Sequence, residues 1–241
     1  MRADVFLVER GYAKSRSEAQ AAIRAGLVTV SGARLSKPSQ SISANAAIEY
    51  RKPHPFVSRA GGKLVAALNH FALSPRDRIC LDLGASTGGF TGVLLERGAA
   101  RVYALDVGHG QMDQELARDP RVRLREGFNA RDLTAAALPE PVTALTADLS
   151  FISLTLALPP ALALAAQGAW AVILVKPQFE VGKAAIGKGG IVRDAGARNR
   201  ALEGIDDFIA GTQGWRVLGT MESPMRGGDG NIEYLLAASK A

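Results

Sequence analysis

The sequence predicts a doubly wound α/β domain with a mostly parallel sheet in residues 59–241, preceded by a small α+β domain in residues 1–58. Three observations indicate this division. Apolar runs alternate with helix-like segments from residue 79 onward, which is typical of a parallel sheet covered by helices. A glycine-rich segment directly follows the first of these runs. The net charge of +6 lies wholly in the first 60 residues, which hold ten Lys or Arg and four Asp or Glu.

The small domain begins with two predicted helices. The first covers residues 3–10. Either Ser15 or Ser17 can cap the second, and Ser15 has the spacing to Glu18 of a capping box. Gly26 ends the second helix, because glycine readily adopts the left-handed conformation found there. Three further features complete the domain: strands at 27–30 and 47–50, a turn at Ser31-Gly32, and a stiff connector at 52–55 within a linker at about 51–58.

The larger domain reads as alternating strands and helices. Five buried strands are predicted at 79–83, 102–105, 122–124, 143–147 and 170–175. Helices are predicted at 89–97, 154–166 and 195–211. Two last strands, at 215–221 and 232–237, flank a polar loop and predict an antiparallel hairpin at the C-terminus.

The composition excludes several classes of protein. Hydrophobic residues make up 47% and charged residues 22%, which is typical of a globular protein. No run of about 18 uncharged apolar residues is present, so no membrane-spanning helix is expected. The early acidic and basic residues exclude a secretory signal. A single cysteine, Cys80, excludes an internal disulfide and a cysteine-rich metal site, so we expect a cytoplasmic protein. We also expect a monomer without a bound metal.

The glycine-rich segment 82–90 predicts a binding site for a nucleotide-like ligand. Glycines between a strand and a helix let the backbone approach a ligand closely. The spacing is not GxGxxG, so a ligand without a pyrophosphate is expected. Asp106 ends the next strand, where its carboxylate can accept hydrogen bonds from ribose hydroxyls, and Asn129 can bind an adenine edge. The segment's candidate contacts are Gly84, Ala85, Ser86, Gly88, Gly89 and Phe90.

Four charged residues are expected to meet at the same edge of the sheet. Lys63 precedes the first strand, Asp148 and Lys176 end the fourth and fifth, and Glu233 begins the last. Strand ends of one sheet converge on one cleft. This Lys–Asp–Lys–Glu order resembles the tetrad of the FtsJ-like 2′-O-ribose methyltransferases.

That resemblance implies methyl transfer from S-adenosylmethionine to a ribose hydroxyl, with S-adenosylhomocysteine as the product. Lys176 then serves either as a general base or as a fixed donor that orients the hydroxyl oxygen. Asp148 would hold Lys176 and shape the region near the methionyl end of the donor. Lys63 and Glu233 would fix the network and the ribose.

Longer motifs extend the resemblance to nearly the whole chain. Residues 15–42 resemble the RNA-binding fold of ribosomal small-subunit protein four, which implies an RNA-facing surface. Its candidate contacts, with one from the following segment, are Arg2, Lys14, Arg16, Arg24, Lys37 and Arg59. The segments LDLGASTGGFT, ADLSFISL, VKPQFEVGK and GGDGNIEYL are similar to those of the TlyA family, called haemolysin A or 16S/23S rRNA (cytidine-2′-O)-methyltransferase.

The TlyA resemblance implies a Rossmann-like class I methyltransferase sheet with an antiparallel C-terminal strand. It implies a cytidine ribose in ribosomal RNA or ribosomal subunits as the substrate, in 23S and in some members also 16S RNA. Three alternatives stay open: a membrane-active haemolysin-like protein, a methyltransferase of a non-RNA substrate, and an RNA-binding chaperone without catalysis. No membrane partner is expected, because no strongly amphipathic basic helix is evident.

Overall fold

The structure is a computed structural model that describes residues 1–13, 15–51 and 56–241. Its internal contacts divide the chain into two compact units, Met1–Pro55 and Phe56–Ala241. Lys14 and the predicted connector at 52–55 lie outside the described residues. In the described part of the chain, no helix is long and apolar enough to cross a membrane.

The N-terminal unit is a small α+β fold, as the sequence predicts. Ser15 accepts a hydrogen bond from the Glu18 backbone N–H at 3.2 Å, and Gly26 has a φ of +73°, so both predicted helix boundaries are confirmed. The helices are α1 (Ala3–Glu9) and α2 (Arg16–Arg24), and the antiparallel strands are β1 (Val28–Val30), β2 (Ala33–Arg34) and β3 (Ile48–Tyr50), in the order β2-β1-β3. Its buried core includes Phe6, Leu7, Ile23, Val28 and Leu35.

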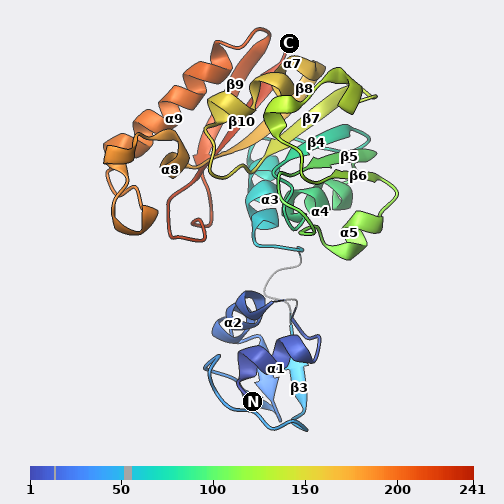
Figure 1. Ribbon diagram of the computed structural model, residues 1–241, viewed down its shortest axis with the longest axis vertical. Coiled ribbons are helices and arrows are strands. Elements are labelled where there is room, and N and C mark those ends of the chain that lie inside the picture. The colour runs from blue at the N-terminus through green and yellow to red at the C-terminus, as the bar shows by residue number, and fades with distance from the viewer. Residues whose placement is uncertain (14, 52–55) are drawn as a thin grey trace. The chain divides into compact units, whose positions relative to one another are not determined.

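The second unit is built on a seven-stranded sheet with the order β6-β5-β4-β7-β8-β10-β9 (Figure 1). Neighbours from β6 to β8 are parallel, while β10 is antiparallel to both β8 and β9. This confirms the predicted sheet and its antiparallel C-terminal strand. The strands are β4 (Ile79–Leu83), β5 (Arg101–Leu105), β6 (Val122–Arg125), β7 (Val142–Ala147), β8 (Ala165–Val175), β9 (Trp215–Glu222) and β10 (Tyr234–Lys240).

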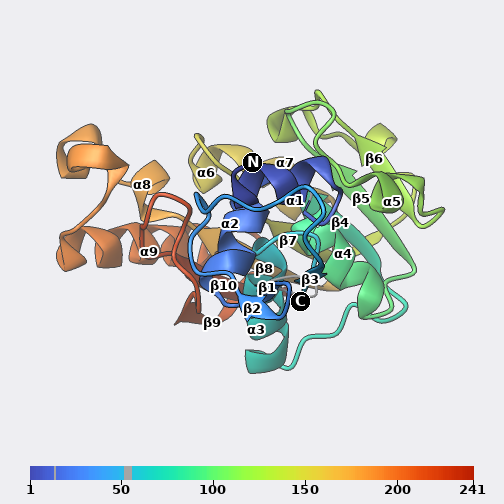
Figure 2. The same ribbon diagram turned by 90° about the horizontal axis from the view of Figure 1, so that it is seen from below.

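Helices cover both faces of this sheet. One buried cluster joins α3 and α4 to one face, and a second joins α6, α7 and α9 to the other. Figures 1 and 2 both place α8 and α9 at the β9 end of the sheet and α5 at the β6 end. The helices are α3 (Ala60–His70), α4 (Gly89–Glu96), α5 (Gln114–Arg118), α6 (Leu154–Ala157), α7 (Pro159–Leu164), α8 (Pro177–Glu180) and α9 (Ala195–Ala210). Short 3-10 turns occur at Ala130–Asp132, Ala135–Ala137, Lys183–Ala185 and Lys188–Gly190.

Two predicted elements differ from the observed ones. The helix predicted at 154–166 is interrupted, because Pro159 and Pro160 lack a backbone N–H and open a new helix, α7. Strand β8 begins at Ala165, whereas the sequence predicts that it begins at residue 170. Helix α3 was not predicted, and Lys63 lies in its first turn.

The sheet brings the candidate site residues to one edge. Gly84, Asp106, Asp148 and Lys176 each directly follow a strand, namely β4, β5, β7 and β8. Tyr234 of β10 pairs with Val175 of β8, so the antiparallel register extended by one residue places Glu233 opposite Lys176. Ligands of doubly wound sheets bind at this carboxyl edge.

Candidate active site

The turn after β4 is packed tightly against β7. Gly84 has a φ of +77°, and a Cβ built there would lie 2.4 Å from the carbonyl oxygen of Asp148. The backbone N–H groups of Gly84 and Ala85 donate to the Leu105 carbonyl oxygen at 2.9 and 3.1 Å. A side chain at position 84 is therefore excluded both by backbone conformation and by space.

The other predicted residues of the turn pack against neighbouring side chains, line a small cavity, or do both. A Cβ at Gly88, which has a φ of +92°, would meet Met112 and Leu116. Phe90 lies in the core with 2% of its surface exposed. Gly89 lies against Ser58, whose Oγ would be 2.2 Å from an added Cβ. A small cavity of about 80 Å³ is lined by Ser58, Ala60, Gly84, Ala85, Ser86, Thr87, Gly89, Phe90 and Asp148.

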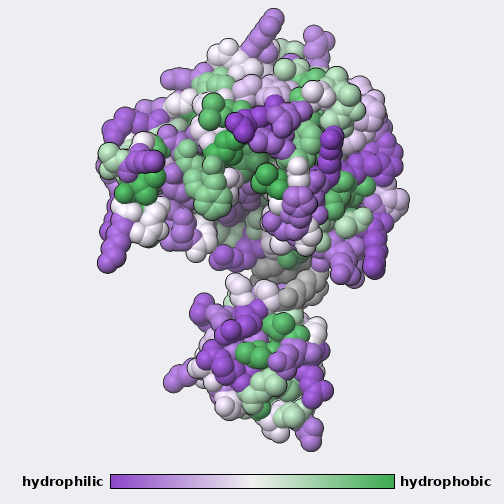
Figure 3. Space-filling view, viewed as in Figure 1, coloured by the Kyte–Doolittle hydropathy of each residue, from purple (hydrophilic) through white to green (hydrophobic). Residues whose placement is uncertain are grey.

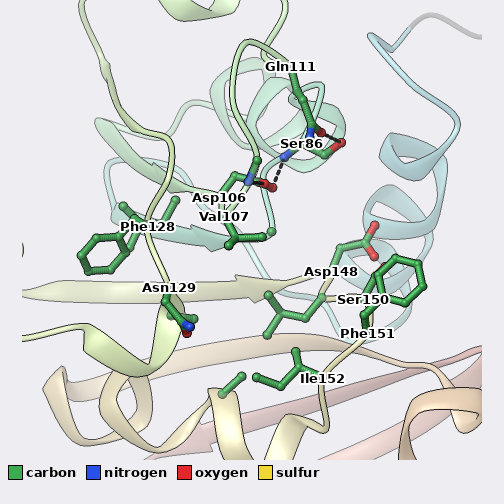
Figure 4. A pocket seen from close by; sticks show the side chains of 16 residues that line it. Ser86, Asp106, Val107, Gln111, Phe128, Asn129, Asp148, Ser150, Phe151 and Ile152 are labelled. Atoms are coloured by element: carbon green, nitrogen blue, oxygen red, sulfur yellow. Dashed lines mark hydrogen bonds between the residues drawn. The ribbon is translucent and has the colours of Figure 1, made fainter.

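A larger cavity of about 520 Å³ opens between the ends of β4, β5 and β7. Gly84, Ser86, Asp106, Asn129 and Asp148, five of the predicted cofactor contacts, line it together. Its apolar lining residues are Leu105, Val107, Phe128, Ala130, Leu149, Phe151, Ile152 and Ala157. Figure 4 shows Phe128 and Asn129 on one side of this cavity and Asp148, Ser150 and Phe151 on the other. In the space-filling view, hydrophobic residues gather near the middle of the visible face of this unit (Figure 3).

Asp106 joins the two loops that border the cavity. Its Oδ2 accepts a hydrogen bond from Ser86 N at 2.7 Å, and its Oδ1 accepts one from Gly108 N at 2.7 Å. The Ser86 hydroxyl also donates to Gln111 Oε1 at 2.9 Å (Figure 4). Each carboxylate oxygen has a second lone pair, so Asp106 can still accept hydrogen bonds from a ribose.

Glu126 anchors the loop that carries Gln111, a role that the sequence did not reveal. Its carboxylate accepts hydrogen bonds from the backbone N–H groups of Gly110, Gln111 and Met112 at 2.6, 2.9 and 3.4 Å. These bonds, led by that from Gly110, hold the pKa of Glu126 below its usual range. A glutamate directly after an edge strand has no motif spacing that could have predicted this contact.

One side of the cavity is formed by Phe128 and Asn129. Asn129 Oδ1 caps the short turn that begins at Ala130 and accepts a hydrogen bond from Arg131 N at 3.0 Å. The guanidinium of Arg125 lies 4.2 Å from the centroid of the Phe128 ring. The Asn129 oxygen thus fixes the backbone of this turn, and its amide nitrogen is a donor group at the wall of the cavity.

The four charged candidates form two ion pairs. Lys176 Nζ lies 2.6 Å from Asp148 Oδ1 and donates to Ser150 Oγ at 2.8 Å. Lys63 Nζ lies 2.5 Å from Glu233 Oε2. All four side chains are less than a fifth exposed, and the extended β8–β10 register sets Glu233 opposite Lys176. The two pairs therefore adjoin one another at the carboxyl edge of the sheet.

A further carboxylate, Asp82, is fully buried beneath the turn. Thr91 Oγ1 donates to its Oδ2 at 2.7 Å and Thr146 Oγ1 to its Oδ1 at 2.9 Å, which ties α4 and β7 to β4. Burial raises the pKa of Asp82 to about 6, against the lowering effect of these two bonds. Asp82 thus stabilises the elements on either side of the turn by hydrogen bonding to α4 and β7.

Known proteins resemble this chain over both units. A family model described as FtsJ-like methyltransferase matches residues 56–240, and one described as S4 domain matches residues 1–48. The chain is 46% identical over 237 residues to the 16S/23S rRNA (cytidine-2′-O)-methyltransferase TlyA of Mycobacterium tuberculosis (strain ATCC 25618 / H37Rv), covering 98% of this chain and 88% of that protein. The chain belongs to the TlyA family.

Two further relatives support this membership. Hemolysin A of Brachyspira hyodysenteriae is 41% identical to the TlyA-family chain, with 98% of each protein covered. A solved structure from Streptococcus thermophilus, named as a hemolysin, superposes with a TM-score of 0.79 at 40% identity, covering 100% of this chain and 88% of that one. The O-methyltransferase from Bacillus cereus has a TM-score of 0.53 at 17% identity and shares the fold alone.

Two of the predicted RNA contacts in the S4 domain of this TlyA-family chain hold a buried carboxylate. Arg2 Nε and Arg16 Nη2 each lie 3.0 Å from Asp4, and Gln20 Nε2 donates to it at 2.8 Å. The bond from Arg2 holds the pKa of Asp4 well below its usual range. Both arginines stay about half exposed, so each can contact a ligand as well as Asp4.

The remaining predicted RNA contacts are separately placed. Arg24 is exposed and donates to Gln20 Oε1 at 3.4 Å. Lys37 is exposed on the same unit, and Lys14 lies outside the described residues. Arg59 belongs to the second unit, where it lines a cavity with Lys63.

Proposed function

We propose that this chain transfers a methyl group from S-adenosylmethionine to the 2′-hydroxyl of a cytidine ribose in ribosomal RNA. The observation that carries the proposal is the Lys176–Asp148 pair, which lies at the carboxyl edge of a methyltransferase sheet and next to a cavity of nucleoside size. The TlyA relatives from M. tuberculosis and Campylobacter jejuni, named for 16S/23S and 23S rRNA, supply the substrate class.

The large cavity fits the adenosine half of S-adenosylmethionine. Asp106 has free lone pairs for ribose hydroxyls, Asn129 has an amide nitrogen for the adenine edge, and Phe128 and Ile152 offer apolar faces. The small cavity beside Gly84 and Asp148 would hold the methionyl end. When bound, this donor supplies a methyl group on a positively charged sulfur, and the enzyme's task is mainly to align the acceptor.

We infer that Lys176 acts on the acceptor hydroxyl. Lys176 Nζ can make three hydrogen bonds, and Asp148 and Ser150 account for two of them. The third is left for the ribose 2′-oxygen. Methylation forms the O–C bond, breaks the S–C bond and releases the hydroxyl proton. A neutral Lys176 would accept that proton, whereas an ammonium would orient the oxygen and leave the proton to water. If Lys176 is the general base, the rate of the chemical step rises with pH. If Lys176 only orients the hydroxyl oxygen, the rate does not rise with pH.

Mapping of the product tests this function. Purified protein is incubated with labelled S-adenosylmethionine and with unmodified small and large ribosomal subunits, or their naked RNAs. We expect label on the 2′-oxygen of a cytidine, detected as a linkage resistant to alkaline hydrolysis and located by mass mapping of fragments. Label on a base, on a protein or on a small molecule alone would contradict the proposal. Comparison of the two subunits identifies the substrate RNA.

A further inference from the structure

A third cavity, of about 270 Å³, lies beside the Lys63–Glu233 pair. Residues from three separate segments line it: the start of α3, the turn after β4, and the loop between β9 and β10. Its lining includes the cationic residues Arg59, Lys63 and Arg226. It shares Ser58, Ala60, Ser86 and Thr87 with the small cavity that reaches Asp148, so the two cavities adjoin.

The charge of this cavity is positive and mostly uncompensated. Lys63 is neutralised by Glu233, but Arg59 and Arg226 form no ion pair with any residue that the structure describes. Arg226 donates only a long hydrogen bond, 3.3 Å, to the carbonyl oxygen of Gly230. Both arginines are exposed, so their guanidinium groups are available to a ligand. Two planar guanidinium groups at one cavity favour a phosphate or carboxylate.

Two helices add partial positive charge at the same place. Helix α3 begins at Ala60 and α4 at Gly89, and neither N-cap residue, Arg59 or Gly88, caps its helix with a side chain. Ala60 and Thr87 line the cavity at these two starts. The dipole of a helix favours an anion near its N-terminus.

The loop that carries Arg226 is held in place by its neighbours. A Cβ on Gly62 would lie 2.8 Å from Met225 Cε, so the loop packs directly on α3. Gly227 N donates to Asn231 O at 2.9 Å, and the buried Asn231 side chain bonds Val192 N and Gly190 O. The loop that carries Arg226 is therefore ordered before a ligand binds, so binding costs little free energy for ordering this loop.

We propose that Arg59 and Arg226 form a binding site for one RNA phosphodiester that flanks the methylated ribose. This inference rests on the proposed function, because it takes RNA as the ligand. The site adjoins the Lys63–Glu233 pair, so a phosphate bound there sets the position of the next ribose relative to Lys176. The site goes beyond the N-terminal basic residues, since Arg226 belongs to the catalytic unit.

Steady-state kinetics with the full-length protein tests the site. Arg226→Ala should raise KM for RNA roughly tenfold at low salt, with a smaller change in kcat and an unchanged Kd for S-adenosylmethionine. The slope of log KM against log salt should fall by about one, as for the loss of one phosphate contact. Arg226→Lys keeps a charge and should retain the slope while raising KM less.

Two comparisons make the result specific. Arg76→Ala, an exposed arginine before β4 at the opposite edge of the sheet, should match the wild type. In the Arg59→Ala/Arg226→Ala double variant, the factor by which KM for RNA rises should be smaller than the product of the factors for the two single variants, because both arginines contact one phosphate. An Arg226→Ala variant with wild-type KM and salt slope, or fully multiplicative losses, would overturn the site. A wild-type protein that methylates no RNA would instead contradict the proposed function.

Discussion

Lys63 Nζ lies 2.5 Å from Glu233 Oε2, and this contact joins helix α3 to the start of β10 across 170 residues of sequence. Both side chains are at most a tenth exposed. Removing one member of a buried pair leaves an uncompensated charge, which typically lowers the free energy of unfolding by about 3–5 kcal/mol. The pair therefore has a structural role that can be measured apart from catalysis.

Lys63→Met and Glu233→Leu are each expected to destabilise the second unit by that amount. The double variant should lose less than the sum, because it leaves no unpaired charge. Urea unfolding followed by fluorescence reports on this unit, since Trp170 and Trp215 both lie in it. Additive losses in the double variant would show that the two side chains are not coupled.

Ser150 is a positioning residue for Lys176, on the evidence of the 2.8 Å hydrogen bond between them. Ser150→Ala should reduce kcat by roughly tenfold, because Lys176 keeps Asp148 but loses its second fixed partner. KM for RNA and the Kd for S-adenosylmethionine should stay within about twofold. Ser150→Thr retains the hydroxyl and should recover most of kcat. An equal loss in both variants would point to a steric effect and not to this bond.

Gly84→Ala should abolish binding of S-adenosylmethionine. The residue has a φ of +77°, and the new methyl group would meet the Asp148 carbonyl oxygen. Gly168→Ala is the matched control, because Gly168 has a φ of +73° and open space around it. The control should lose only the roughly 1–3 kcal/mol of backbone strain and keep binding. Calorimetric titration of both variants measures this, and donor binding by Gly84→Ala would refute the packing argument.

Asp82 should make the second unit less stable as pH rises. Its pKa is raised by burial to about 6, above the usual value of about 3.9. Its stabilising effect is therefore complete below about pH 4 and is lost as pH rises through about 6. Relative to the neutral Asp82→Asn variant, the wild type should lose roughly 2 kcal/mol between pH 4 and pH 7. Unfolding curves at several pH values test this, and a constant difference would contradict the assigned environment.

Local sequence patterns predicted most of the fold. Apolar runs such as that at 79–83 gave the strands, because a strand buried on both faces needs a continuous apolar segment. Helix α3 was missed, since Gly61 and Gly62 obscure its pattern. A Cβ on Gly61 would lie 2.7 Å from Phe56 Cβ, and one on Gly62 would lie 2.8 Å from Met225 Cε. These packing contacts favour glycine at both positions, and a local apolar pattern does not contain that information.

The site was predictable to a similar extent. Residues that directly follow strands, such as Asp106 and Asp148, were found from motif spacing. Glu126, Ser150 and Arg226 were not, because their partners lie in other loops and their spacing follows no periodic rule. The ion pairs of Arg2 and Arg16 with Asp4 were also hidden, since the sequence does not show that Asp4 is buried between them.

We propose that Lys176, fixed by Asp148, acts on the ribose hydroxyl of RNA. Single-turnover methyl transfer by Lys176→Ala at saturating S-adenosylmethionine and RNA, with donor binding measured in parallel, tests this role. The rate should fall by about 10²–10⁴-fold with the Kd for S-adenosylmethionine unchanged. A Lys176→Ala variant that binds the donor and methylates RNA at the wild-type rate would contradict it.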